Sequence, residues 1–184
     1  MVLNKYILLS LAVLVQITAF AGSPMPPVLE IQNQKLTLNG SGIRNKYMID
    51  LFEGGLYLKE KCQNAEKIIR ADELMSIRIV VTSKVITAKR LEENIRSEFL
   101  RLTNGLMDGY KDRLESLVKA MARDVYKGDV FDLTYKPDEG LKIYKNNVFQ
   151  VTIPGLDFKK ILFSIYLGND PCDARLKNNM LGNS

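Results

Sequence analysis

The spacing of the apolar residues changes along the chain, and this change constrains the fold more than any other feature. The pattern at 75–82, in which Met75, Ile77, Ile79 and Val81 alternate with Ser76, Arg78 and Thr82, has the period of a half-buried strand. Apolar residues then recur at helical spacing over 91–102 and 114–121. Further strand patterns lie at 35–38, 47–58, 131–135, 141–145 and 149–153, and further helical patterns lie at 157–168 and 173–181.

Strands followed by two helices, more strands and a closing helix form a segregated pattern. Such a pattern predicts an α+β fold, a mostly antiparallel sheet with helices packed on one face. Because the chain shows no internal repeat and no linker, we expect residues 22–184 to form one domain. The space between the sheet and its helices is the natural place for an apolar cavity.

Small and polar residues mark the expected boundaries of these elements. Asn146 and Asn147 tolerate the positive φ of a tight hairpin, so we predict that they join the last two strands. Asp157 is a plausible N-cap for the helix that follows. Gly40 and Gly42 predict a turn after the first strand pattern.

The strand pattern at 47–58 contains two polar residues, Asp50 and Glu53, that fall on opposite faces of a regular strand. A change of register would resolve this conflict. We predict it at Gly54 and Gly55, where a bulge forms most easily.

The N-terminal residues read as a targeting segment. Lys5 precedes an apolar run that ends in Ala19, Phe20 and Ala21, a small-x-small cleavage signal. The run is short for a bilayer span, and no basic flank follows it. We therefore expect a signal peptide at 1–21, a periplasmic or secreted protein, and no transmembrane segment after cleavage.

Charge and composition exclude several functions. The formal charge is +5, or +4 without Lys5, and acidic and basic residues are mixed along the chain. Basic stretches such as 84–90 lack interleaved aromatic residues, so no nucleic-acid partner is expected. The chain has no histidine, which removes the usual general base and the commonest metal ligand. We expect no cofactor; haem or metal binding would need Tyr, Met or Cys ligands.

Cys62 and Cys172 are the two cysteines of the chain. In an oxidising compartment an even pair predicts a disulfide, which here would join the end of the 47–58 strand pattern to the C-terminal segment. The alternative is two separate buried thiols. No C-x-x-C motif is present, so redox catalysis is not expected.

Several short motifs, in their order and spacing, resemble the chalcone isomerase-like family, in particular its secreted bacterial members. These motifs are Gly40, Gly42 and Arg44 followed by GLYL at 55–58, KGDVFDLTY at 127–135, GLKIYKNNVFQVTI at 140–153 and the ending FSIYLGNDPCDARLKNNMLG. The resemblance runs over nearly all of residues 22–184. It implies an antiparallel sheet, a helical layer and a ligand cleft between them.

Plant enzymes of this family close a chalcone into a flavanone, and their arginine holds the oxygen charge that develops. The resemblance places Arg44 at that position, where a guanidinium donates several hydrogen bonds and stays charged. It also places Phe52, Leu91 and Glu98 where the enzymes carry threonine, tyrosine and asparagine. The loss of one hydrogen-bond donor to an oxyanion costs about 100-fold or more in rate. Efficient chalcone isomerisation is therefore not expected.

Non-catalytic relatives bind fatty acids, and their arginine receives the carboxylate. The resemblance therefore implies a non-catalytic protein that binds a small amphipathic or fatty-acid-type ligand, with Arg44 as the anion anchor. The expected ligand-binding residues are Arg44, Tyr47, Phe52, Tyr57, Leu91 and Ile95. One of the two tyrosines would donate a second hydrogen bond to the carboxylate.

Two other functions stay open from the sequence. The first is an isomerase, an intramolecular lyase of the chalcone isomerase type, on an unknown enone. The second is a structural or interaction protein with a vestigial cleft. Arg44 would then pair with an acid such as Asp50 or cap the glycine turn.

Overall fold

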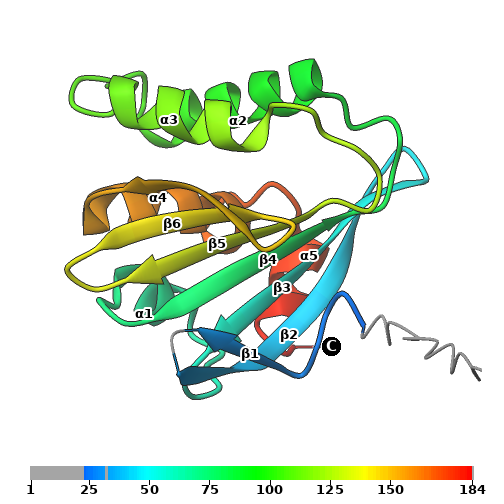
Figure 1. The fold of residues 1–184 in the computed structure, drawn as a ribbon, viewed down its shortest axis with the longest axis vertical. Coiled ribbons are helices and arrows are strands. Elements are labelled where there is room, and N and C mark those ends of the chain that lie inside the picture. The colour runs from blue at the N-terminus through cyan, green and yellow to red at the C-terminus, as the bar shows by residue number, and fades with distance from the viewer. Residues whose placement is uncertain (1–22, 32, 184) are drawn as a thin grey trace, which may run out of the picture.

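The computed structural model describes residues 23–31 and 33–183, which form one curled antiparallel sheet with helices (Figure 1). The strands are β1 (Val28–Ile31), β2 (Gln34–Lys46), β3 (Ile49–Leu58), β4 (Met75–Val81), β5 (Val130–Lys136), β6 (Gly140–Lys145) and β7 (Val148–Ile153). The helices are α1 (Ala65–Arg70), α2 (Ala88–Leu102), α3 (Lys111–Met121), α4 (Leu156–Leu167) and α5 (Ala174–Met180). The expected signal peptide lies outside the described residues.

Each strand pairs with its neighbours in sequence, in the order β1-β2-β3-β4-β5-β6-β7, and all pairs are antiparallel. The predicted α+β class is confirmed, and β4 has the predicted bounds to within one residue. The sequence pattern misses β1 and α1, because four and six residues are too few to show a period. In the part of the chain that the structure describes, no helix is both long and apolar enough to cross a bilayer.

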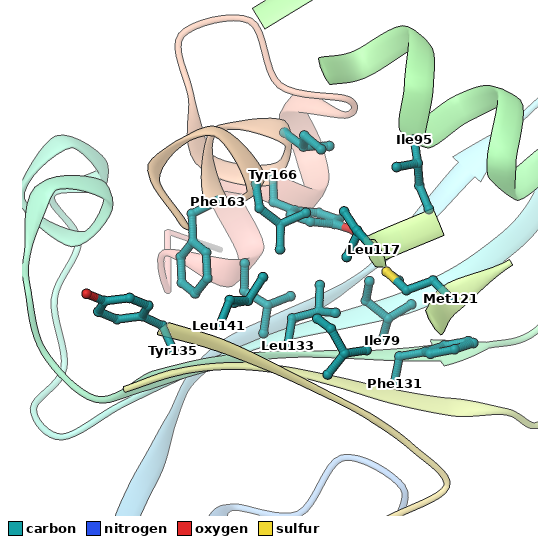
Figure 2. Close-up of a cluster of buried hydrophobic side chains, with 14 of the residues drawn as sticks. Ile79, Ile95, Leu117, Met121, Phe131, Leu133, Tyr135, Leu141, Phe163 and Tyr166 are labelled. Carbon is teal, nitrogen blue, oxygen red and sulfur yellow. The ribbon is translucent and has the colours of Figure 1, made fainter. Parts of the chain in front are cut away.

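All five helices pack on the same face of the sheet. Side chains from each of them join one large core with alternate residues of β3 to β7. Figure 2 shows this core, with Ile79 and Phe131 of the sheet facing Met121 of α3 and Tyr166 of α4. The opposite face carries a smaller cluster, which consists of Met25, Leu29, Leu36, Tyr57, Leu74 and Val80. The N-terminal segment and β1 supply part of it.

The predicted turn at Gly40 and Gly42 is wrong, because β2 runs straight through both glycines. They are needed for close packing. A Cβ on Gly40 would lie 2.1 Å from the carbonyl oxygen of Asn179 in α5. Asn39 completes this junction, since its Nδ2 donates to the carbonyl oxygens of Met180 (2.8 Å) and Cys62 (3.0 Å). The glycines therefore let α5 lie against the strand.

The chain instead turns between β2 and β3 at Tyr47 and Met48, whose φ angles are 53° and 65°. The register of β2 against β3 shifts at Asn39 and again at Leu51. The register change predicted at Gly54 and Gly55 is wrong, because β3 pairs with β4 without a break from Phe52 to Tyr57.

The hairpin predicted at Asn146 and Asn147 is confirmed; both residues have positive φ, 50° and 65°. Asp157 is not the N-cap of α4, which is Gly155. The Asp157 carboxylate instead accepts two hydrogen bonds from the Arg113 guanidinium, at 2.9 and 2.8 Å. This ion pair ties α3 to the start of α4.

A buried lysine joins α4 to the end of α1. The Lys159 side chain is inaccessible to solvent, and its Nζ donates to the carbonyl oxygens of Ile68 (2.8 Å), Ile69 (2.9 Å) and Ala71 (2.8 Å). These carbonyls belong to the last turn and C-cap of α1, where the helix dipole favours a cation. Burial lowers the pKa of Lys159 to about 8, so the amine is charged at neutral pH.

Candidate functional site

A cleft of about 510 Å³ lies between the sheet and the helices. This volume falls within the range of about 300–1,000 Å³ that small-molecule sites occupy. Its lining comes from β2 to β5, the β4–α2 loop, α2, the end of α3, α4 and the segment before α5. The lining residues are Arg44, Lys46, Tyr47, Ile49, Leu51, Phe52, Ile79, Val81, Val85, Ile86, Arg90, Leu91, Glu93, Asn94, Ile95, Glu98, Met121, Phe131, Leu162, Ile165, Tyr166 and Cys172.

The inner part of the lining is apolar. Ile79, Met121 and Phe131 are nearly inaccessible to solvent, and Figure 2 shows Ile79 and Phe131 side by side on the sheet, with Met121 facing them from α3. The charged lining residues are more exposed than these apolar ones. The cleft therefore has a charged mouth and an apolar interior, which is the polarity of an amphipathic ligand.

Arg44 stands at the boundary between these two parts. It lies on β2 directly opposite Phe52 of β3, and its guanidinium carbon is 5.7 Å from the centroid of that ring. The guanidinium makes no hydrogen bond or ion pair with any other residue that the structure describes. Asp50, the alternative partner, instead accepts a hydrogen bond from Asn45 Nδ2 at 2.9 Å. The N–H groups of the Arg44 guanidinium are thus available to donate hydrogen bonds to a ligand.

Lys46 and Arg90 are the other two cations of the lining. Within residues 23–31 and 33–183, neither has a carboxylate within 4.0 Å. Arg90 donates from Nη1 to the carbonyl oxygen of Val85 at 3.2 Å. Lys46 Nζ lies 5.5 Å from the centroid of the Tyr47 ring.

The two acids of the lining are both paired with cations outside it. Glu98 accepts from Arg101 at 2.5 Å, and Glu93 lies 4.0 Å from Lys89. The three cations of the lining outnumber its two acids, each of which lies beside a further cation, so the mouth of the cleft attracts anions.

Tyr166 is a lining residue that the sequence analysis missed. Its ring meets Phe52 edge to face, with 6.5 Å between the centroids and an angle of 78° between the planes. Burial raises the pKa of Tyr166, and the charge of Arg44 opposes that shift. The Phe52 ring links the two groups, since it meets both the Tyr166 ring and the Arg44 guanidinium. No hydrogen bond joins the hydroxyl to another described residue. Its spacing of four from Leu162 is the signal that would have placed it on the inward face of α4.

The predicted disulfide is not formed, because Cys62 and Cys172 are both free thiols. Cys62 lies in the loop after β3, where its amide donates to Asn39 Oδ1 at 2.7 Å. Cys172 lines the cleft, and its amide donates to the carbonyl oxygen of Ile165 at 2.7 Å. Burial raises the pKa of the Cys172 thiol to about 11, and the charge of Arg44 opposes the shift.

Of the six residues predicted to bind a ligand, five line the cleft: Arg44, Tyr47, Phe52, Leu91 and Ile95. Tyr57 does not. It is buried on the opposite face of the sheet, where its hydroxyl donates to the carbonyl oxygen of Pro26 at 2.8 Å. Regular pairing from Phe52 to Tyr57 puts residues five apart on opposite faces, so the prediction for Tyr57 is wrong.

Comparison with known proteins agrees with this architecture. The sequence profile of the family described as chalcone isomerase-like matches residues 17–182. Among solved structures, the chain is similar to the fatty-acid binding protein AtFAP1 of Arabidopsis thaliana, with 17% identity and a TM-score of 0.67. That match covers 86% of this chain and 91% of AtFAP1. No curated protein sequence gives a significant match. The resemblance inferred from the motifs is therefore confirmed, and the chain belongs to the chalcone isomerase-like family.

Proposed function

We propose that this protein binds an amphipathic carboxylic acid of the fatty-acid type in the cleft. The carboxylate pairs with Arg44 at the mouth, and the acyl chain lies against the apolar interior. The observation that carries the proposal is an arginine beside an apolar cavity, with no ion pair or hydrogen bond to any described residue. A guanidinium suits a carboxylate because its paired N–H groups match the two carboxylate oxygens.

The rest of the lining supports this assignment. Each methylene group removed from water contributes about 0.8 kcal/mol, so the apolar wall favours a long chain over a short one. Phe52 and Leu91 both face the cleft and offer no hydrogen-bond donor to an enolate. This favours binding over the isomerase alternative. The structural similarity to a fatty-acid binding protein is consistent with the same choice.

The proposed compartment is the periplasm or the cell exterior, reached after removal of residues 1–21. The apolar run and its small-x-small ending support this proposal. An extracytoplasmic binding protein would carry a poorly soluble acid through water, which requires no catalysis.

Native mass spectrometry of protein purified from its host tests the function directly. We expect a species heavier than the processed chain by the mass of a fatty acid, which solvent extraction releases and which returns when the acid is added. A chain that purifies empty and takes up no fatty acid would contradict the proposal. Turnover of a chalcone or a related enone would favour the isomerase.

Ligand binding is expected to protect Cys172 from alkylation. Cys172 lines the cleft, whereas Cys62 lies outside it and serves as an internal control. With its pKa raised to about 11, the Cys172 thiol is mostly protonated at pH 8, and its rate of alkylation should keep rising to about pH 11. Peptide mass mapping should show slower labelling of Cys172 alone once fatty acid is added. Equal protection of both cysteines, or of neither, would place the ligand elsewhere.

A further inference from the structure

The turn between β2 and β3 exposes large apolar side chains. We call residues 46–49 the hairpin tip. Tyr47 is 87% exposed and Met48 is 96% exposed. Both have positive φ, which Asn and Gly adopt at low cost in such turns and larger side chains rarely do. Neither the exposure nor the backbone strain stabilises the fold, and strain of this kind gathers at functional sites.

Cations surround the hairpin tip. Lys46 is part of it, and Arg44 lies two residues before it on β2. Lys84 is exposed on the β4–α2 loop, which also leads to Arg90. Thr82 holds this loop against β3, since its hydroxyl donates to the carbonyl oxygen of residue 50 at 3.0 Å. In Figure 1 the β2–β3 turn lies beside this loop.

The acidic residues near the hairpin tip do not cancel these cations. The cations Arg44, Lys46, Lys84 and Arg90 outnumber Asp50 and Glu93, and Glu93 lies 4.0 Å from a further cation, Lys89. Exposed apolar side chains ringed by cations match the interface of an anionic lipid bilayer, where aromatic rings and aliphatic side chains enter the headgroup layer. Lysine and arginine are attracted to the negative surface.

We propose that the hairpin tip docks the protein on an anionic lipid bilayer. Tyr47 and Met48 enter the headgroup layer, and the surrounding cations face the phosphates. The tip and the cleft share Lys46, Tyr47 and Ile49, so docking places the cleft mouth at the membrane surface. Transfer of a ligand between bilayer and cleft rests on the proposed function, whereas docking itself does not.

Sedimentation with lipid vesicles tests the docking, with protein purified as the cell processes it. We expect binding to vesicles of mixed phosphatidylglycerol and phosphatidylcholine to be at least about tenfold stronger than binding to phosphatidylcholine alone. The double variant Tyr47→Asn with Met48→Gly should lose about tenfold or more of the affinity for the mixed vesicles. It should keep or gain thermal stability, because Asn-Gly is the preferred pair for a turn with two positive φ angles.

Two further variants separate the contributions. Leu106→Asn removes a comparable apolar side chain, 74% exposed, from the α2–α3 loop at the other end of α2, and should bind vesicles as the parent does. Lys84→Gln should weaken binding to mixed vesicles by about fivefold and leave binding to phosphatidylcholine unchanged.

Three results would overturn the docking proposal. These results are failure of the parent chain to bind the mixed vesicles, equal binding by the tip variant and the parent, and tip-dependent self-association in sedimentation velocity without vesicles. Met48 does not line the cleft, so Met48→Gly should bind free fatty acid normally. Tip-dependent vesicle binding by a chain that takes up no fatty acid would refute the proposed function and leave docking intact.

Discussion

Replacing Arg44 with methionine is expected to weaken binding of a long-chain fatty acid by about 10- to 100-fold. A hydrogen bond to a charged group contributes about 1.5–3 kcal/mol, and 1.4 kcal/mol is tenfold in affinity. Methionine keeps an apolar stem against Phe52, so the loss reports on the guanidinium alone. Thermal stability should be unchanged, because Arg44 makes no hydrogen bond within the described chain. Titration calorimetry on delipidated protein measures the change.

The methyl ester of the same fatty acid provides the matched control on the ligand side. If the guanidinium pairs with the carboxylate, the parent should bind the acid about 10- to 100-fold more tightly than the ester. The variant Arg44→Met should bind acid and ester almost equally. Arg123→Met removes an arginine whose side chain is 79% exposed outside the cleft, and should have no effect. If Arg90→Met abolishes the preference and Arg44→Met does not, the anchor is Arg90 and the assignment is wrong.

Replacing Lys159 with methionine is expected to lower the free energy of unfolding by about 3–5 kcal/mol. The ammonium group satisfies three carbonyl oxygens at the end of α1, and methionine leaves them without a donor. Methionine nearly fills the same volume, so the loss is electrostatic rather than a cavity effect. The midpoint of thermal unfolding should fall by about 10 °C, measured by circular dichroism.

Lys160 is the matched control for this stability experiment, because it is adjacent on α4 and only half-buried. Lys160→Met should change the midpoint little. Local opening is a second readout, since hydrogen exchange in α1 should speed up in Lys159→Met even where the whole domain stays folded. Unchanged exchange in α1 would show that the three hydrogen bonds do not hold this helix.

The local periodicity of apolar residues was sufficient to predict the positions of the long helices and of strand β4. Alternation predicted the bounds of β4 to within one residue, and helical spacing predicted α2, α3 and α4 within a few residues. Both patterns work because burying one face of an element requires apolar residues at its period. The hairpin at Asn146 and Asn147 was equally predictable, because the tolerance of asparagine for positive φ is a property of the residue itself.

The glycines of β2 show where local reasoning fails. Gly40 and Gly42 are residues typical of a turn, yet they lie within strand β2. They have to be glycines because α5, from the other end of the chain, packs too close to leave room for a Cβ. The real turn is at Tyr47 and Met48, two residues with poor turn propensity. The hydrogen bond between Asn39 and Met180 joins residues 141 positions apart, so an analysis of local sequence patterns cannot detect it.

Some residues of the candidate site could be predicted from the sequence and others could not. Arg44, Phe52 and Leu91 were expected near one another from the family resemblance, and all three line the cleft. Tyr57 was expected to donate a hydrogen bond to the ligand, but regular pairing from Phe52 to Tyr57 turns it to the other face of the sheet. Tyr166 was missed because its place in the cleft, against Phe52, depends on how α4 packs on the sheet.

The sequence by itself determined the fold class and the family, along with the arginine most suited to hold an anion, because these follow from periodicity, composition and motif order. Only the tertiary structure decided three points: which side chains share the cleft, that both lining acids lie beside cations while Arg44 has no ion pair with a described residue, and that Lys159 holds the end of α1. Burial and charge pairing depend on distances between segments far apart in the chain, and packing of the whole domain sets those distances.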